Sequence, residues 1–141
     1  MSAGNGALMR TLPVGIAYKN PLNVYQWAIS IAKMTHWDIR AGLTCAVYSL
    51  AVRNILDGTL DQYLALTKAA KVEGKDFEDA VVRAVNLGGD ADTIGAIAGG
   101  LAGVYWGYGA IPDRWLEKFT PEQRTRLDRA AEGLLKVREG H

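Results

Sequence analysis

A run of evenly spaced glycines in the second half of the chain constrains the fold more than any other feature. The glycines are Gly95, Gly99, Gly103 and Gly107. Residues four apart lie on one side of an α-helix, so a helix beginning near Thr93 would carry a stripe without side chains. Each glycine costs a helix about 1 kcal/mol relative to alanine. The spacing therefore predicts a central, nearly all-round buried helix, the most buried of the fold, with another element packed very close to the stripe.

Two carboxylates and a hydroxyl stand where this helix begins, in the sequence Gly88-Gly89-Asp90-Ala91-Asp92-Thr93. An acidic residue is favourable there because the first N–H groups are unpaired and the helix dipole is positive. A cap helped by Thr93 would explain Asp90 but not Asp92. The two carboxylates converge only if Asp90 precedes the helix and Asp92 lies in its first turn. The residues leave two interpretations open: a helix cap, or a site for a hard cation such as magnesium, calcium or manganese.

The rest of the chain shows helical periodicity and no convincing strand alternation. We expect residues 1–20 to be irregular, a helix from Asn20-Pro21, and a second helix capped by Asp38 and ended by Asp57-Gly58. Further helices are expected over residues 60–72 and from Phe77, and a last one from Thr120-Pro121. The expected inward residues include Trp27, Leu43, Val47, Leu127, Ala130, Leu134 and Val137. The pattern predicts one all-α domain, residues 1–141, of about six or seven helices around the glycine-rich helix.

Composition and charge narrow the function classes. A chain of 141 residues with 49% hydrophobic and 22% charged residues fits one globular domain. The net charge of +1 argues against a strong attraction to nucleic acid or to an anionic membrane. No apolar run reaches the ~20 residues that span a bilayer, and no signal peptide is evident. The lone Cys45 fits a buried, inert thiol, and a cytoplasmic protein is expected.

Two smaller features are open to a functional or a structural interpretation. Gly4-Asn5-Gly6 is a turn whose N–H groups could form an anion-binding nest, or simply part of a frayed terminus. His36 lies in the break between two expected helices rather than on an apolar face. It is therefore either a structural or exposed histidine, or a contact to a ligand.

Three stretches taken together resemble the C-terminal half of the ADP-ribosylglycohydrolase family. They are Ser2-Ala3-Gly4-Asn5-Gly6-Ala7-Leu8-Met9-Arg10 with Pro13, then Thr35-His36 with Asp38, then Gly88-Gly89-Asp90-Ala91-Asp92-Thr93-Ile94 with its glycine-rich helix and Ile111-Pro112. The resemblance covers nearly the whole chain, and the last block is its most specific part. It implies an all-α fold, a pair of magnesium or manganese ions, and removal of ADP-ribose from modified side chains by cleavage of an N- or O-glycosidic bond.

The resemblance also implies roles for individual residues. Asp90, Asp92 and Thr93 would be metal ligands, with Asp92 bridging both ions and the two carboxylates serving catalysis. The ADP-ribose site would be lined by Ser2, Gly4, Asn5, Gly6 and His36. The expected partner is accordingly ADP-ribose or an ADP-ribosylated protein.

One departure from the family pattern limits these implications. The family has an N-terminal half with a Thr-Asp-Asp ligand set and an acidic residue near the scissile bond, and no Thr-Asp-Asp occurs in this sequence. We therefore expect a fragment, one half of a split protein, or a relic. The candidate functions are half of a glycohydrolase, a module that binds ADP-ribose or a cation without chemistry, and an oligomeric helical remnant. The isolated chain is expected to be inactive, and to form a homo-oligomer or pair with a complementary N-terminal-half chain.

Overall fold

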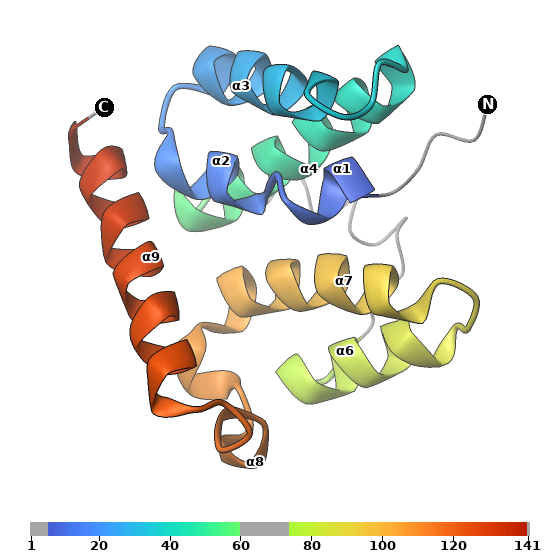
Figure 1. Ribbon diagram of the computed structural model, residues 1–141, viewed down its shortest axis with the longest axis vertical. Helices are drawn as coiled ribbons and strands as arrows, with labels where there is room; N and C mark the ends of the chain where they lie inside the picture. Colours follow the sequence, from blue (N-terminus) through green and yellow to red (C-terminus); the bar gives the residue numbers. More distant parts are fainter. Residues whose placement is uncertain (1–5, 60–73, 141) are drawn as a thin grey trace.

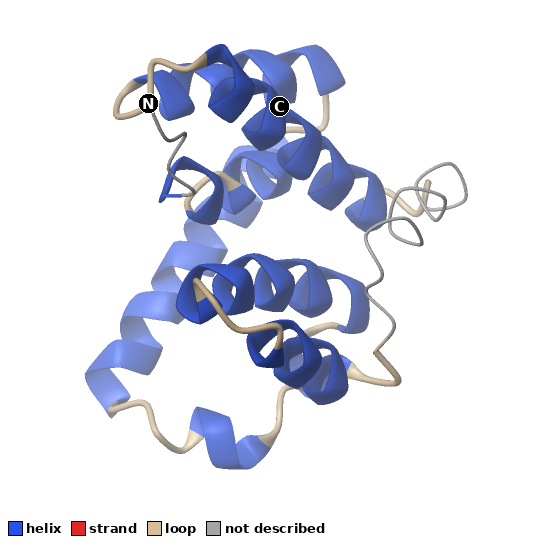
Figure 2. Ribbon diagram, turned by 90° about the vertical axis from the view of Figure 1, so that its right-hand side faces the viewer, coloured by secondary structure: helices blue, strands red, loops and turns tan. Residues whose placement is uncertain are grey.

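The computed structural model describes residues 6–59 and 74–140, and every regular element in these ranges is a helix (Figure 2). The elements are α1 (Gly6–Met9), α2 (Leu12–Ala17), α3 (Pro21–Lys33), α4 (Ile39–Leu56), α6 (Phe77–Asn86), α7 (Ala91–Trp106), a 3-10 turn η2 (Tyr108–Ala110), α8 (Asp113–Leu116) and α9 (Pro121–Gly140). The all-α prediction is confirmed. The helix expected over residues 60–72 lies outside the described residues. None of the described helices is long and apolar enough to cross a membrane.

The helices form two groups with a long helix beside them (Figure 1). Helices α1 to α4 make one group, whose core consists of Ala7, Val14, Val24, Ala28, Ala32, Cys45 and Ala46. Helices α6 and α7 make the other, with a smaller core of Phe77, Ala80 and Ala102 backed by Trp106 and Trp115. Helix α7 faces the first group and touches both α1 and α4. It therefore lies between the two cores.

The glycine stripe packs against α6. A Cβ atom placed on Gly95 would lie 2.9 Å from Val85 Cγ2, and one on Gly99 would lie 3.8 Å from Val81 Cγ2. Gly103 meets the ring of Phe77 in the same way, at 3.9 Å. The very close packing predicted from the spacing is present at Gly95 alone, because Gly99 and Gly103 have ordinary van der Waals distances and Gly107 has no neighbour within 4 Å. That residue ends α7 with φ of 82°, a left-handed conformation that favours glycine.

The tightest contact of α7 is made by a glycine outside the stripe. A Cβ atom on Gly100 would lie 2.5 Å from Leu12 Cδ1 and 2.7 Å from the Tyr48 hydroxyl oxygen. The same hydroxyl donates a hydrogen bond of 3.2 Å to the Ile97 carbonyl. Burial raises the pKa of Tyr48 above its ordinary value, so the phenol stays a neutral donor. Gly100 thus allows α7 to approach α2 and α4 closely.

The expectation that the glycine-rich helix is the most buried is wrong for the described residues. Helix α7 buries only Thr93 and Ala102 fully, and 52% of Tyr105 is exposed. Helix α4 buries eight of its residues. The reason lies in the neighbours: α4 is covered by α1, α2 and α3, whereas α7 has α6 on one side and α1 and α4 on the other.

The inward face of α4 also differs from the prediction. Leu43 and Val47 are exposed, and the helix turns small or polar residues inward instead. These residues are Ala41, Gly42, Cys45, Ala46, Tyr48, Ser49, Val52 and Asn54. Small side chains are favoured on this face because the backbones of α2 and α4 lie close together. A Cβ atom on Gly15 of α2 would lie 2.3 Å from the Ser49 carbonyl oxygen. Residues 12–17 are helical, where an irregular segment was expected, and residues 6–9 are helical as well.

Trp27 was expected to face inward from α3, but 49% of it is exposed. It stacks on Tyr18, with ring centroids 6.1 Å apart and planes 9° from parallel. The deeper positions of α3 belong to Val24, Ala28 and Ala32. The large aromatic ring therefore covers the edge of the core rather than filling it.

Helix α9 begins as predicted but buries little. Thr120 N donates to Gln123 Oε1 at 2.8 Å, and Gln123 N donates back to Thr120 Oγ1 at 3.3 Å, which is a reciprocal capping box. No residue of α9 is buried, and the expected inward residues Leu127 and Val137 are 55% and 39% exposed. The helix is secured near its end, where Arg138 donates to the Ile16 carbonyl and pairs with Asp57.

Candidate functional site

The residues Asp90, Asp92 and Thr93 lie at the start of α7. Gly88 and Gly89 precede them with φ of 75° and 72°, conformations that glycine adopts without strain. Asp90 takes the N-cap position at φ −83° and ψ 64°, but its side chain makes no capping hydrogen bond. Asp92 is in the first turn and is exposed, whereas only 7% of Thr93 is exposed. The arrangement matches the predicted one, with Asp90 before the helix and Asp92 inside it.

The short helix α1 contacts this helix start through a sulfur atom. The Thr93 hydroxyl donates to Met9 Sδ at 3.5 Å, although the two residues are 84 positions apart in the sequence. This contact uses the hydroxyl hydrogen, and a hydroxyl keeps two lone pairs as acceptors. Helix α1 therefore brings the N-terminal motif to the Asp-Ala-Asp-Thr motif.

His36 lies near the N-terminal end of α1, beside Gly6. Its ring nitrogen Nδ1 is 2.8 Å from Thr35 Oγ1, and the same hydroxyl oxygen accepts a hydrogen bond from the Arg10 guanidinium. A Cβ atom placed on Gly6 would lie 3.7 Å from His36 Cε1. The half-buried histidine therefore faces Gly6, the first described residue of the predicted glycine turn.

The structure thus gathers parts of all three sequence motifs around α1. Helix α1 contacts α3, α4 and α7, and it has His36 at one end and Thr93 near the other. Ser2, Gly4 and Asn5 lie outside the described residues, so their predicted role in binding ADP-ribose stays a prediction. Gly6 and His36 do lie together.

A complete metal centre is not formed by the described residues. Within residues 6–59 and 74–140, no group of three or more histidine, cysteine, aspartate or glutamate side chains could hold a metal ion. The donor chemistry of Asp90, Asp92 and Thr93 nevertheless fits magnesium or manganese, which prefer carboxylate and hydroxyl oxygens. Two carboxylates and one hydroxyl fill at most half of an octahedral shell.

Cys45 takes no part in this region. It is fully buried in the core of α1 to α4, and burial raises the pKa of its thiol. A buried thiol with a raised pKa is a poor nucleophile. The expectation of an inert core cysteine agrees with this environment.

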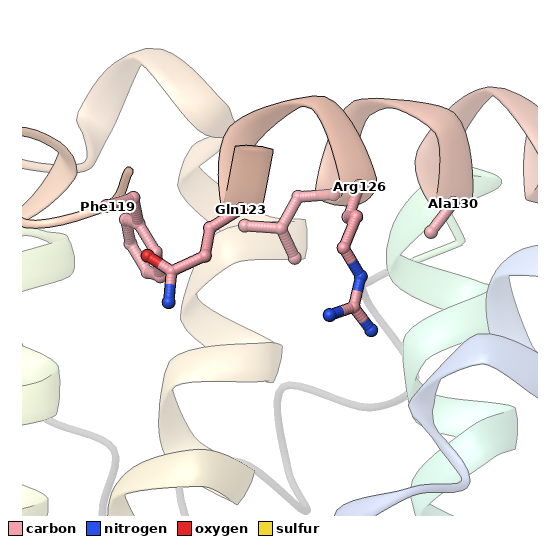
Figure 3. A pocket seen from close by; sticks show the side chains of 5 residues that line it. Phe119, Gln123, Arg126 and Ala130 are labelled. Carbon is pink, nitrogen blue, oxygen red and sulfur yellow. The ribbon is translucent and has the colours of Figure 1, made fainter. Parts of the chain in front are cut away.

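A cavity of about 320 Å³ lies elsewhere, along the first half of α9 (Figure 3). It is lined by Phe119, Gln123, Arg126, Leu127 and Ala130, whose labelled side chains point to the same side of the helix. None of the predicted site residues lines it.

Sequence reasoning also did not single out Met9, Arg10 or Thr35 as contact residues, because these contacts join residues far apart and follow no periodic pattern.

Comparison with known proteins gives a consistent result. The ADP-ribosylglycohydrolase family model matches residues 1–73 and, in a second overlapping match, residues 62–141. The ADP-ribosyl-(dinitrogen reductase) glycohydrolase of Rhodospirillum rubrum is 28% identical over 165 residues, which cover 94% of this chain and 56% of that relative. The ADP-ribosylarginine hydrolase Tri1 of Serratia proteamaculans is 45% identical over 49 residues, 35% of this chain and 13% of that relative.

A solved structure of an ADP-ribosylglycohydrolase-related protein complex has the same fold, with a TM-score of 0.79 at 31% identity. The match covers 96% of this chain and 60% of the solved one. The chain thus spans little more than half the length of the R. rubrum relative and of the solved structure. Two family-model matches that together cover residues 1–141, and a shared fold, lead to one conclusion: the chain belongs to the ADP-ribosylglycohydrolase family.

Proposed function

We propose that this chain forms the part of an ADP-ribosylglycohydrolase site that holds ADP-ribose and one side of a magnesium or manganese centre. The observation that carries the proposal is the position of α1, which contacts His36 through Gly6 and Thr93 through Met9. Three segments that are distant in the sequence therefore meet at α1. The relatives named as glycohydrolase and ADP-ribosylarginine hydrolase support an ADP-ribosylated protein as the substrate.

In this proposal Asp90, Asp92 and Thr93 hold the cation. The exposed carboxylate of Asp92 stands in the first turn of α7, and Thr93 is kept in place by its bond to Met9. A divalent cation bound there would polarise a ribose oxygen or lower the pKa of a water molecule. His36 and Gly6 would orient the ADP-ribose beside that cation.

We further propose that bond cleavage needs acidic residues from a second, complementary polypeptide. Glycoside cleavage commonly uses one carboxyl group to assist the leaving group and another group to supply the nucleophile. No third acidic or histidine ligand joins Asp90 and Asp92 among the residues that the structure describes. The same observation favours the second candidate function, a module that binds ADP-ribose or a cation but performs no reaction.

Calorimetry and a turnover assay test the proposal. We expect the purified chain to bind ADP-ribose and Mn²⁺ weakly, and to release no ADP-ribose from arginine- or serine-modified peptides. Asp92→Asn should abolish Mn²⁺ binding because it removes one of two carboxylates. Asp113→Asn is the matched control, since Asp113 is also an exposed first-turn carboxylate, in α8.

Two outcomes would contradict this proposal. Unchanged Mn²⁺ affinity in Asp92→Asn would place the cation elsewhere. Robust multiple turnover by the chain alone, lost in Asp92→Asn, would show that it builds a complete site without a complementary polypeptide. If the chain binds both ligands and a complementary chain restores no turnover, the binding-module function is the better one.

A further inference from the structure

Three side chains, Arg10, Thr35 and His36, are linked by consecutive hydrogen bonds. The Arg10 guanidinium donates to Thr35 Oγ1, and Thr35 Oγ1 lies 2.8 Å from His36 Nδ1. Arg10 follows α1, whereas Thr35 and His36 lie between α3 and α4. The contact from Arg10 therefore crosses from one segment of the candidate site to another.

The direction of the first hydrogen bond constrains the second. Arginine has only donors, so Thr35 Oγ1 must be the acceptor toward Arg10. A donor that approaches a hydroxyl oxygen polarises its O–H bond and makes the hydroxyl a better donor in turn. The acceptor within reach of that hydroxyl is His36 Nδ1. In the reverse arrangement Arg10 and Nδ1–H would occupy both lone pairs of the oxygen, and the hydroxyl hydrogen would lose this acceptor.

The surroundings of the His36 imidazole are consistent with Nε2 acting as a hydrogen-bond donor. A neutral imidazole that accepts at Nδ1 carries its hydrogen on Nε2. The Cε1 atom, which lies between the two nitrogens, faces Gly6, and within residues 6–59 and 74–140 no hydrogen-bond partner of Nε2 is present. The backbone is fixed as well, because His36 N donates to the Ala32 carbonyl at 2.8 Å.

We propose that Arg10 and Thr35 are positioning residues for His36: they hold its ring in the tautomer that carries the hydrogen on Nε2, so that Nε2–H donates to a phosphate or ribose oxygen of bound ADP-ribose. This inference rests on the proposed function for its ligand. The tautomer itself does not depend on the ligand, so the two statements can be tested separately.

Nitrogen NMR of the imidazole tests the tautomer directly. At a pH at which the ring is neutral, the unmodified chain should show Nδ1 as an unprotonated acceptor and Nε2 as a protonated donor. Thr35→Val keeps the side-chain shape and removes the hydroxyl, so the signals should shift toward a mixture of tautomers. Thr35→Ser should restore the original spectrum. A ring that is protonated on Nδ1 in the unmodified chain, or a spectrum unchanged in Thr35→Val, would overturn the proposal.

Calorimetry with ADP-ribose tests the consequence for binding. Thr35→Val should raise the Kd roughly tenfold, the loss expected for one hydrogen bond to a charged group, and Arg10→Gln should raise it by about threefold. Thr35→Ser should bind like the unmodified chain. Thr44→Val is the matched control, because the exposed Thr44 donates only to the Arg40 carbonyl of its own helix. Equal losses in the Thr35 and Thr44 variants would mean that folding, not positioning, is responsible.

The two experiments separate failure of this inference from failure of the proposed function. If the unmodified chain does not bind ADP-ribose, the proposed function fails, and the NMR spectra still decide whether Thr35 sets the tautomer. If the chain binds ADP-ribose and Thr35→Val binds equally well, the proposed function stands and the positioning role is refuted.

Discussion

At the scale of single residues, Asp38 combines a helix cap with an ion pair. Its carboxylate accepts from Arg40 N at 2.9 Å and pairs with Arg40 Nη2 at 2.6 Å. The side-chain hydrogen bonds from Arg40 are the largest cause that lowers the pKa of Asp38 from 3.8 to about 2. The charged carboxylate is therefore favoured in the folded state.

The lowered pKa of Asp38 predicts a pH dependence of stability. Because the folded pKa lies below the unfolded one, the contribution is fully present above pH 3.8 and is lost as the pH falls toward about 2. Asp38→Asn keeps a capping side chain but no charge. Urea unfolding should show the largest difference between parent and variant near neutral pH, and this difference should shrink below pH 3.8 and disappear as the pH falls through about 2. A difference that stays constant over this range would contradict the assignment.

Residue by residue, the sequence revealed the local contacts and missed the distant ones. The cap at Asp38 and the capping box of Thr120 and Gln123 could be recognised because each joins residues at most three positions apart. The bond from Thr93 to Met9 and the Arg10–Thr35 bond join positions 84 and 25 apart. No short pattern encodes such pairs, since they depend on how whole helices pack.

At the scale of elements, the glycine stripe of α7 packs against α6, and Gly100 packs against α2 and α4. The stripe toward α6 leaves ordinary contact distances at Gly99, whereas another carbon on Gly100 would require Leu12 and Tyr48 to move aside. The periodic pattern identified the correct helix and a correct face. It could not show which glycine has the closest neighbour, because the spacing gives the direction of a residue around the helix and not its distance to another element.

A pair of alanine substitutions tests this ranking. Gly99→Ala should be neutral or stabilise the fold by up to about 1 kcal/mol, because alanine favours helix and its Cβ atom would meet Val81 at 3.8 Å. Gly100→Ala should destabilise by about 1–3 kcal/mol through overpacking. Chemical unfolding of both variants measures the difference. Equal stability of the Gly99→Ala and Gly100→Ala variants would show that the side chains between α7 and its neighbours α2 and α4 rearrange at little cost.

Helix α4 illustrates why the inward faces were harder to predict. Leu43 and Val47 were expected to face inward, and both are exposed. The buried positions are instead held by small residues that let α2 and α3 come close. Size and hydropathy alone therefore indicated the wrong side of the helix.

At the scale of the whole molecule, apolar side chains remain exposed on several of the described helices, α4 and α9 among them. Leu127 and Leu135 of α9 are 55% and 53% exposed, and Leu43 and Val47 of α4 are 43% and 55% exposed. Exposed apolar surface tends to be covered by association. The family resemblance predicted the all-α fold, but the residues left uncovered depend on packing that the sequence did not reveal.

We expect the chain to form dimers or larger assemblies in solution. Sedimentation velocity over a range of protein concentrations measures this, and Leu127→Lys and Leu43→Lys studied in parallel show which helix contributes. A charge placed on the associating helix should shift the chain toward the monomer. A single monomeric species of the parent at every concentration would contradict the expectation.

The attachment of Arg138 to Ile16 and Asp57 has a consequence for the order of folding during synthesis. Helices α3 and α4 are neighbours in the chain and can pair as soon as both have left the ribosome. The bond from Arg138 to the Ile16 carbonyl joins residues 122 positions apart, so α9 is synthesised well after the helices that it contacts. The group of α1 to α4 therefore leaves the ribosome with the α9-facing side of α2 uncovered, and α9 closes over α2 in a later step.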